Sequence, residues 1–111
     1  MRRFDPEAEA RRIVKDALCD HLFVERGSLT DEALRLEELG ADSLDIPDIL
    51  IEVEQDVQSL LDKRQYHVDH FIVDAEVTTA TTIAVLITAT MQAINAVIEQ
   101  KEGESDEGKK R

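Results

Sequence analysis

Ser43 is the residue of this chain whose surroundings most clearly favour chemistry. It lies in the stretch Leu36–Asp45, which combines a glycine, one hydroxyl and several carboxylates. Gly40 permits a sharp turn, and Asp42 stands just before an apolar periodic run, where its carboxylate can cap a new helix. The free N–H groups and partial positive charge of a helix start favour a phosphate on a nearby side chain. The pattern therefore predicts an exposed Ser43 that can carry a phosphate group.

Carboxylates flank this serine, although like charges repel a phosphate. Asp42 and Asp45 lie beside it, and Asp48 and Glu52 continue the acidic side of the following segment. They are explained if another protein adds the phosphate and docks on this side through a basic surface. For each of these carboxylates, the alternative is an ordinary solvated surface.

The string Leu39–Asp45 resembles the attachment site of acyl carrier proteins, with its Asp-Ser-Leu motif and leading Leu-Gly. The resemblance implies that Ser43, between Asp42 and Leu44, is esterified with 4′-phosphopantetheine from coenzyme A. The terminal thiol of that arm would carry acyl groups as thioesters. The alternative is an N-cap aspartate and an ordinary first-turn serine on an unrelated helix.

The resemblance also implies which surfaces the partners use. A pantetheinyl transferase and acyl-handling enzymes, such as synthases and acyltransferases, would bind four carboxylates through Arg and Lys: Glu38, Asp45, Asp48 and Glu52. The acyl chain would lie between helices, lined by Leu50, Val53, Val57, Ile83 and Ile87. The protein is then a phosphoprotein carrier in fatty-acid, lipid or polyketide-type biosynthesis, with no catalytic residue and no metal of its own.

Composition indicates one small acidic domain. The chain has 111 residues, 42% of them hydrophobic, and 13 basic against 25 acidic residues give a net charge of −12. This charge repels nucleic acid and favours basic protein partners. Cys19 is the single cysteine, so no intramolecular disulfide is possible. We see no signal segment and no run long enough to span a bilayer, and we expect a cytoplasmic monomer without membrane insertion.

Two amphipathic helices should surround the Ser43 stretch. Asp5 and Pro6 begin a helix over roughly residues 6–22, and a second helix follows Ser43 and ends near Lys63. The long connection between them needs apolar anchors, which are Leu29, Leu34, Leu36 and Leu39. The resemblance implies an all-α four-helix bundle with a long loop between the first two helices.

The second half of the chain has weaker patterns. Val68–Val77 lacks a clean period and is predicted to hold a short third helix, within a stretch after Val57 that is longer than in typical acyl carrier proteins. Residues 78–100 step at helical intervals despite their Thr and Val content, so we predict a helix with Thr78 or Thr79 near its cap. Residues 1–100 would form the acyl-carrier-like domain, and the charged residues 101–111 a disordered tail.

Pro47 departs from the family pattern. It removes an N–H close to Ser43, so the helix either starts later or begins with a bend. Two other functions stay open, the first of them because of Pro47. One is a degenerate carrier that is not modified, and the other is a small acidic helical adaptor that binds a basic partner without a prosthetic group.

Other reactive residues are poor candidates for chemistry. Cys19 and His21 are two apart on a helix and point in different directions, so we expect a structural cysteine. His67 and His70 could share a face, but a zinc site needs three or four matched ligands. The order of ligands in a helix-loop-helix calcium site is absent from the sequence.

Overall fold

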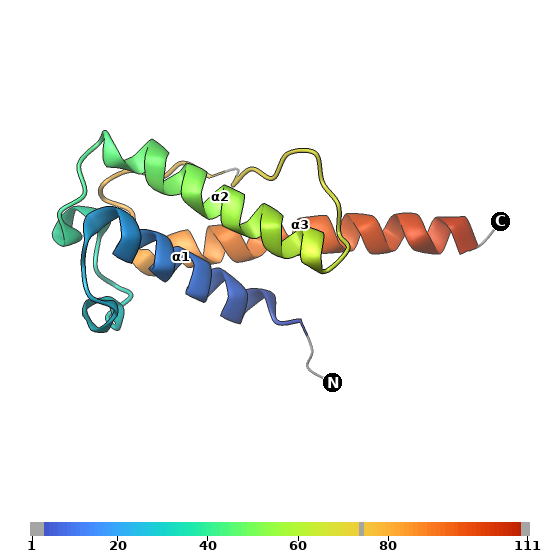
Figure 1. Cartoon of the computed structure of the whole chain (residues 1–111), viewed down its shortest axis with the longest axis horizontal. Coiled ribbons are helices and arrows are strands. Elements are labelled where there is room, and N and C mark those ends of the chain that lie inside the picture. The colour runs from blue at the N-terminus through green and yellow to red at the C-terminus, as the bar shows by residue number, and fades with distance from the viewer. Residues whose placement is uncertain (1–3, 74, 110–111) are drawn as a thin grey trace.

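Three α-helices build the structure, and one of them contacts both others. The computed structural model describes residues 4–73 and 75–109. Within these residues the helices are α1 (Pro6–Leu22), α2 (Asp45–Lys63) and α3 (Ile83–Lys109). The connection from α1 to α2 contains two short 3₁₀ turns, η1 (Arg26–Leu29) and η2 (Leu36–Leu39). α1 packs along both α2 and α3 (Figure 1), whereas the backbones of α2 and α3 rarely approach each other closely. The all-α class is confirmed, but the predicted four-helix bundle is not.

α1 has the bounds that its sequence predicted. Asp5 Oδ1 accepts hydrogen bonds from the N–H groups of Glu7 and Ala8, at 3.1 and 3.3 Å, and Pro6 occupies the first turn, where its missing N–H costs nothing. Its buried stripe is Ala10, Ile13, Val14, Ala17 and Leu18. The helix ends at Phe23, whose left-handed backbone angles cost a non-glycine residue about 1 kcal/mol.

Leucines hold the long connection against the helices, as the sequence predicted. Leu29 and Leu36 are completely buried, and Leu34 and Leu39 pack against the core. The connection also caps α3, because two of its carbonyl oxygens accept hydrogen bonds from the first two N–H groups of that helix, at 2.9 and 2.8 Å. The loop that leads to Ser43 is thereby fixed to the start of α3.

α2 buries the apolar stripe that its period predicted and ends at Lys63, as expected. The buried residues are Ile46, Ile49, Val53, Val57 and Leu61. Leu50 and Leu60 are half-buried at the edge of the same core.

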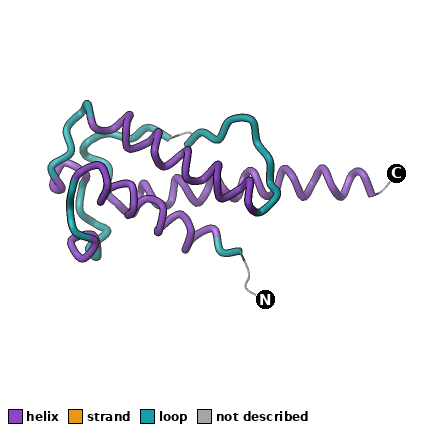
Figure 2. The backbone as a smooth tube through the Cα atoms, viewed as in Figure 1, coloured by secondary structure: helices purple, strands orange, loops and turns teal. Residues whose placement is uncertain are grey.

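The short third helix expected within Val68–Val77 is wrong for the residues that the structure describes there. The chain between α2 and α3 is a loop (Figure 2). The side chain of Gln58 makes hydrogen bonds with three backbone groups of this loop, and Glu54 accepts one from the N–H of Val73 at 2.9 Å. Phe71 and Val73 are buried in the core. Side chains of α2 thus supply the hydrogen bonds that a helix would have made within itself.

α3 begins later than predicted and continues further. Its cap is Thr82, whose Oγ1 accepts from Val85 N at 3.2 Å, whereas the Thr78 hydroxyl accepts from Ala80 N within a preceding turn. The backbone stays helical through Lys109 and extends beyond the other helices (Figure 1), although a disordered tail was expected from residue 101. Residues 110 and 111 of that segment lie outside the described residues.

The segment Ile83–Lys101 of α3 also has the length and composition of a membrane-spanning helix, with a mean hydropathy of 1.3 over its most apolar window. This contradicts the expectation that no run is long enough. About 28% of that window is buried, and its buried residues, such as Leu86 and Ile94, belong to the same core as those of α1.

Candidate functional site

The turn before α2 depends on the backbone of one glycine. Gly40 ends η2 with a φ of 96°, in the left-handed region that a side chain disfavours. Its N–H bonds to the carbonyl of Glu37 at 3.1 Å, and the next N–H, of Ala41, bonds to that of Leu36 at 3.2 Å. Ala41 is buried, so the chain is anchored before it emerges again at Asp42.

Two aspartates cap the start of α2 reciprocally. Asp42 Oδ1 accepts from the N–H groups of Leu44 and Asp45, at 2.9 and 3.1 Å, and Asp45 Oδ2 accepts from the N–H of Asp42 at 2.9 Å. The predicted capping role of Asp42 is confirmed. Asp45 was expected to contact partner enzymes, but one of its carboxylate oxygens accepts a hydrogen bond from the backbone.

Pro47 is compatible with this helix start. It is the third residue of α2, and an N–H at this position would have no partner within the helix. The helix therefore begins later than a first-turn Ser43 would require, which is one of the two outcomes that Pro47 predicted, and Ser43 lies in the turn directly ahead of it.

Ser43 and Leu44 both face solvent. The side chain of Ser43 is exposed, and among the described residues its hydroxyl has no hydrogen-bond partner. Leu44 is 80% exposed although leucine is usually buried. The structure therefore places an accessible hydroxyl and an accessible apolar side chain next to each other.

The carboxylates of α2 nearest to Ser43 meet the end of α1. His21 Nε2 lies 3.6 Å from Asp45 Oδ1 and 3.9 Å from Asp48 Oδ2. Asp48 is well exposed, whereas Asp45 is partly covered. Through these contacts, His21 and the two aspartates join the C-terminus of α1 to the N-terminus of α2.

Further along, like charges from both helices face one another. Burial raises the pKa of Glu52, and a hydrogen bond with the side chain of Asp20 raises it further. Burial likewise raises the pKa of Asp56, with a contribution from the charge of Asp16. Sequence reasoning missed Asp16 and Asp20, although their i, i+4 spacing beside the buried stripe of α1 was a usable signal.

Glu38 does not join this surface. Its carboxylate accepts from the N–H of Arg35 at 2.8 Å and contacts the guanidinium of the same residue. The backbone hydrogen bond is the main reason why the pKa of Glu38 is lowered. Glu38 therefore stabilises η2, at the beginning of the stretch that contains Ser43.

The residues expected to line an acyl pocket belong to the hydrophobic core. They are Leu50, Val53, Val57, Ile83 and Ile87, and all but Leu50 are fully buried. Phe71 and Val73 of the α2–α3 loop belong to the same core, in a bundle where the backbones of the second and third helices rarely approach each other closely. Ile87 also borders a surface groove of about 200 Å³ beside α1.

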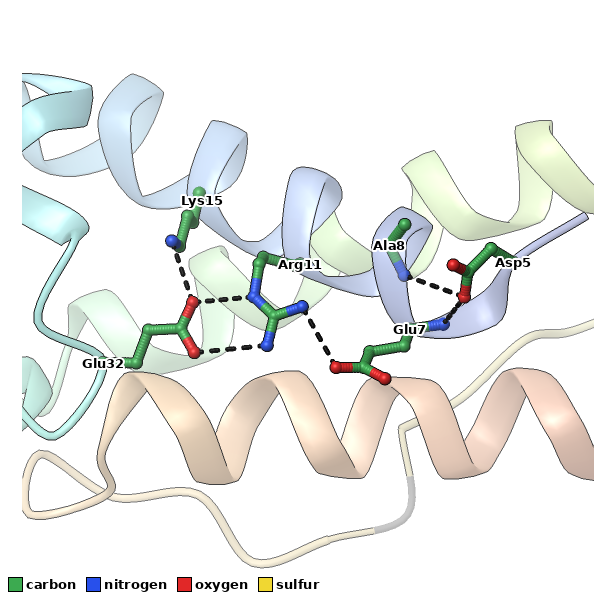
Figure 3. A network of polar contacts seen from close by, with 6 residues as sticks. All are labelled: Asp5, Glu7, Ala8, Arg11, Lys15 and Glu32. Atoms are coloured by element: carbon green, nitrogen blue, oxygen red, sulfur yellow. Dashed lines mark hydrogen bonds and ion pairs between the residues drawn. The ribbon is translucent and has the colours of Figure 1, made fainter.

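An ion-pair network that the sequence did not reveal fixes the loop to α1 (Figure 3). Arg11 donates to both oxygens of Glu32, at 2.7 and 3.3 Å, and Lys15 Nζ lies 2.9 Å from the same carboxylate. Glu7 adds a second carboxylate to Arg11 at 3.3 Å. The hydrogen bonds from Arg11 and Lys15 lower the pKa of Glu32 to about 2.

The other potentially reactive residues belong to other parts of the structure. Cys19 is a free, half-buried cysteine that packs against the core. His67 lies 3.4 Å from Asp62 at the other end of α2. In the part of the chain that the structure describes, no group of three His, Cys, Asp or Glu side chains is arranged to hold a metal ion.

No family model matches the chain, and no solved structure matches it. Membership of the acyl carrier family therefore stays a prediction from the Leu39–Asp45 string. By its own geometry, the site offers a solvent-facing hydroxyl at a capped helix start, bordered by carboxylates and by Leu44.

Proposed function

We propose that this protein is a carrier, on which Ser43 is esterified with 4′-phosphopantetheine and thereby holds acyl intermediates as thioesters. One observation carries the proposal. The side chains of Asp42 and Asp45 accept hydrogen bonds from the backbone at the start of α2, and the Ser43 hydroxyl is exposed and has no hydrogen-bond partner among the described residues. A structural serine at a helix start would normally turn its oxygen to the N–H groups that Asp42 takes here.

The residues present fit such a group. Its attachment requires an accessible serine oxygen, and Ser43 supplies one. In the transfer, Ser43 Oγ forms a bond to the phosphorus that bears pantetheine, the P–O bond within the pyrophosphate of coenzyme A breaks, and adenosine 3′,5′-bisphosphate leaves. The hydroxyl proton passes to a base of the transferase, which also supplies Mg²⁺. Once bound, the arm supplies a thiol that forms thioesters.

The rest of the chain contributes position and charge. The arm keeps its cargo at a high local concentration for each enzyme that docks. The carboxylates of Asp45, Asp48 and Glu52 repel a free phosphate but attract enzymes with basic surfaces. We expect an acyl chain to enter the core at the α2–α3 loop, where Phe71 and Val73 would have to move.

The test is the mass of the intact protein after incubation with coenzyme A and a broad-specificity pantetheinyl transferase. We expect a gain of one phosphopantetheinyl group. Ser43→Ala should abolish the gain, and Ser28→Ala, which alters another exposed serine, should keep it. An unchanged mass with a transferase that is active on a control carrier would refute the carrier function.

A non-catalytic adaptor for a basic partner is the second candidate. The observation in its favour is the acidic surface that α1 and α2 form together, through Asp20, Glu52 and Asp56. Such an adaptor needs the surface but not the hydroxyl. If the protein is an adaptor, the Ser43→Ala variant should bind the partner as well as the wild type does, and the wild type should show no mass gain.

A further inference from the structure

Two large apolar side chains are exposed at the same end of the molecule, one on each side of the α1–α2 contact. Phe23 is 91% exposed and Leu44 is 80% exposed, the highest values among the exposed large apolar residues that the structure describes. Phe23 follows α1 directly, and Leu44 precedes α2 directly. Figure 1 shows that these two helix ends are neighbours, and the His21–Asp45 contact of 3.6 Å joins them.

The fold itself does not explain Phe23. Its φ of 57° and ψ of 37° are those of a helix C-cap position where glycine is usual, because a side chain is strained there. The phenyl ring does not belong to the hydrophobic core or to the residues packed against it. A residue that strains the backbone and exposes its ring makes the fold less stable, so binding is the remaining use for the ring.

The surrounding charges indicate the kind of partner. Asp42, Asp45 and Asp48 stand around Leu44, and the whole chain carries a net charge of −12. A second copy of this chain would bring equal negative charge to the contact and is disfavoured. A protein that offers an apolar pocket bordered by Arg and Lys is complementary both to the two side chains and to the carboxylates around them.

We infer that Phe23 and Leu44 form one docking surface, through which a basic enzyme binds the end of α1 and the start of α2 together. The inference rests on the proposed function for the identity of that enzyme, because an enzyme bound here is positioned over Ser43. It extends the docking surface from the acidic side of α2 to α1.

Substitution of Phe23 by glycine separates an effect on binding from an effect on folding stability. In Phe23→Gly the ring is lost while the backbone strain is relieved, so the midpoint of thermal unfolding should stay the same or rise. Gln65 offers a matched control. It also has a positive φ, of 66°, and is exposed, but it follows the opposite end of α2. Gln65→Gly should relieve strain in the same way without touching the docking surface.

The probe is a broad-specificity pantetheinyl transferase, whose binding is measured by calorimetry without coenzyme A. We expect roughly tenfold weaker binding for Phe23→Gly and for Leu44→Ala, and unchanged binding for Gln65→Gly. Wild-type affinity in Phe23→Gly, or no binding by the wild-type chain, overturns the inference. The carrier function is judged separately, by the mass gain at Ser43. If binding depends on Phe23 but no mass is gained, the docking surface stands and the carrier function falls.

Discussion

The two sides of α1 differ in the charges that meet there. On the side of the long loop, Arg11 and Lys15 surround the carboxylate of Glu32, and every close contact joins opposite charges. On the side of α2, Asp20 approaches Glu52, and burial together with like charge raises the pKa of the glutamate. The ion pairs of Glu32 therefore stabilise one side of α1, whereas on the other side Glu52 and Asp56 lie near like charges.

This difference separates the part that holds the fold from the part that faces partners. Glu32 fixes the loop to α1 through its side chain, and its carbonyl accepts from the N–H of Ala84 at the start of α3. The pKa values of Glu52 and Asp56 are both raised, and the nearby His21 and Arg12 offset this only in part. Repulsion that lowers stability is retained where a basic partner could relieve it.

The largest effect is expected from Glu32→Gln. Losing this carboxylate leaves Arg11 and Lys15 without their shared partner, and we expect the free energy of unfolding to fall by about 1 kcal/mol, discounted for partial exposure of the pair. Denaturant unfolding measures the change. Glu76→Gln, which removes an exposed carboxylate with no ion pair among the described residues, should change stability by much less. Equal effects of the two variants would contradict the assigned role of Glu32.

Acid should remove the advantage that the wild type has over Glu32→Gln. The pKa of Glu32 is lowered from 4.5 to about 2, so its contribution is complete above pH 4.5 and is lost as the pH falls toward 2. We expect the two unfolding free energies to converge across this interval. A difference that stays constant down to pH 2 would show that the ion pairs do not cause it.

The smallest effect, of opposite sign, is expected from Glu52→Gln. The amide can donate a hydrogen bond to Asp20, so repulsion is relieved and stability should rise by about 0.5 kcal/mol near neutral pH. The pKa of Glu52 is raised in the folded state. Below about pH 4.5 the carboxyl is protonated and does not lower the free energy of unfolding, and it begins to do so as the pH rises through the raised pKa. The gain should therefore vanish in acid. A loss of stability at pH 7 would contradict the comparison of the two sides.

Local signals were sufficient for the helices whose ends and faces are encoded in neighbouring residues. Asp5 with Pro6 located the start of α1, and the apolar period located α2. The loop between α2 and α3 was missed because its shape depends on Glu54 and Gln58, which come from another element. Thr82 was missed as a cap because it lies among several threonines that have equal propensity.

The residues of the candidate site also differ in whether local sequence was enough to predict their contacts. Asp42 and Asp45 interact within four residues on either side of Ser43, so this arrangement could be predicted from sequence. Asp20 and Glu32 required knowledge of which elements α1 packs against, which no local pattern contains. The expected acyl-lining residues were correctly assigned to apolar faces, but those faces are filled by the protein's own side chains.

Because α1 shares its core with α3 as well as with α2, the burial of the first helix is complete only when the last one is available. During synthesis, part of the apolar stripe of α1 therefore stays uncovered until the chain has reached Ile94. Folding therefore completes late and depends on distant contacts. In that interval, the high negative charge of the chain opposes aggregation.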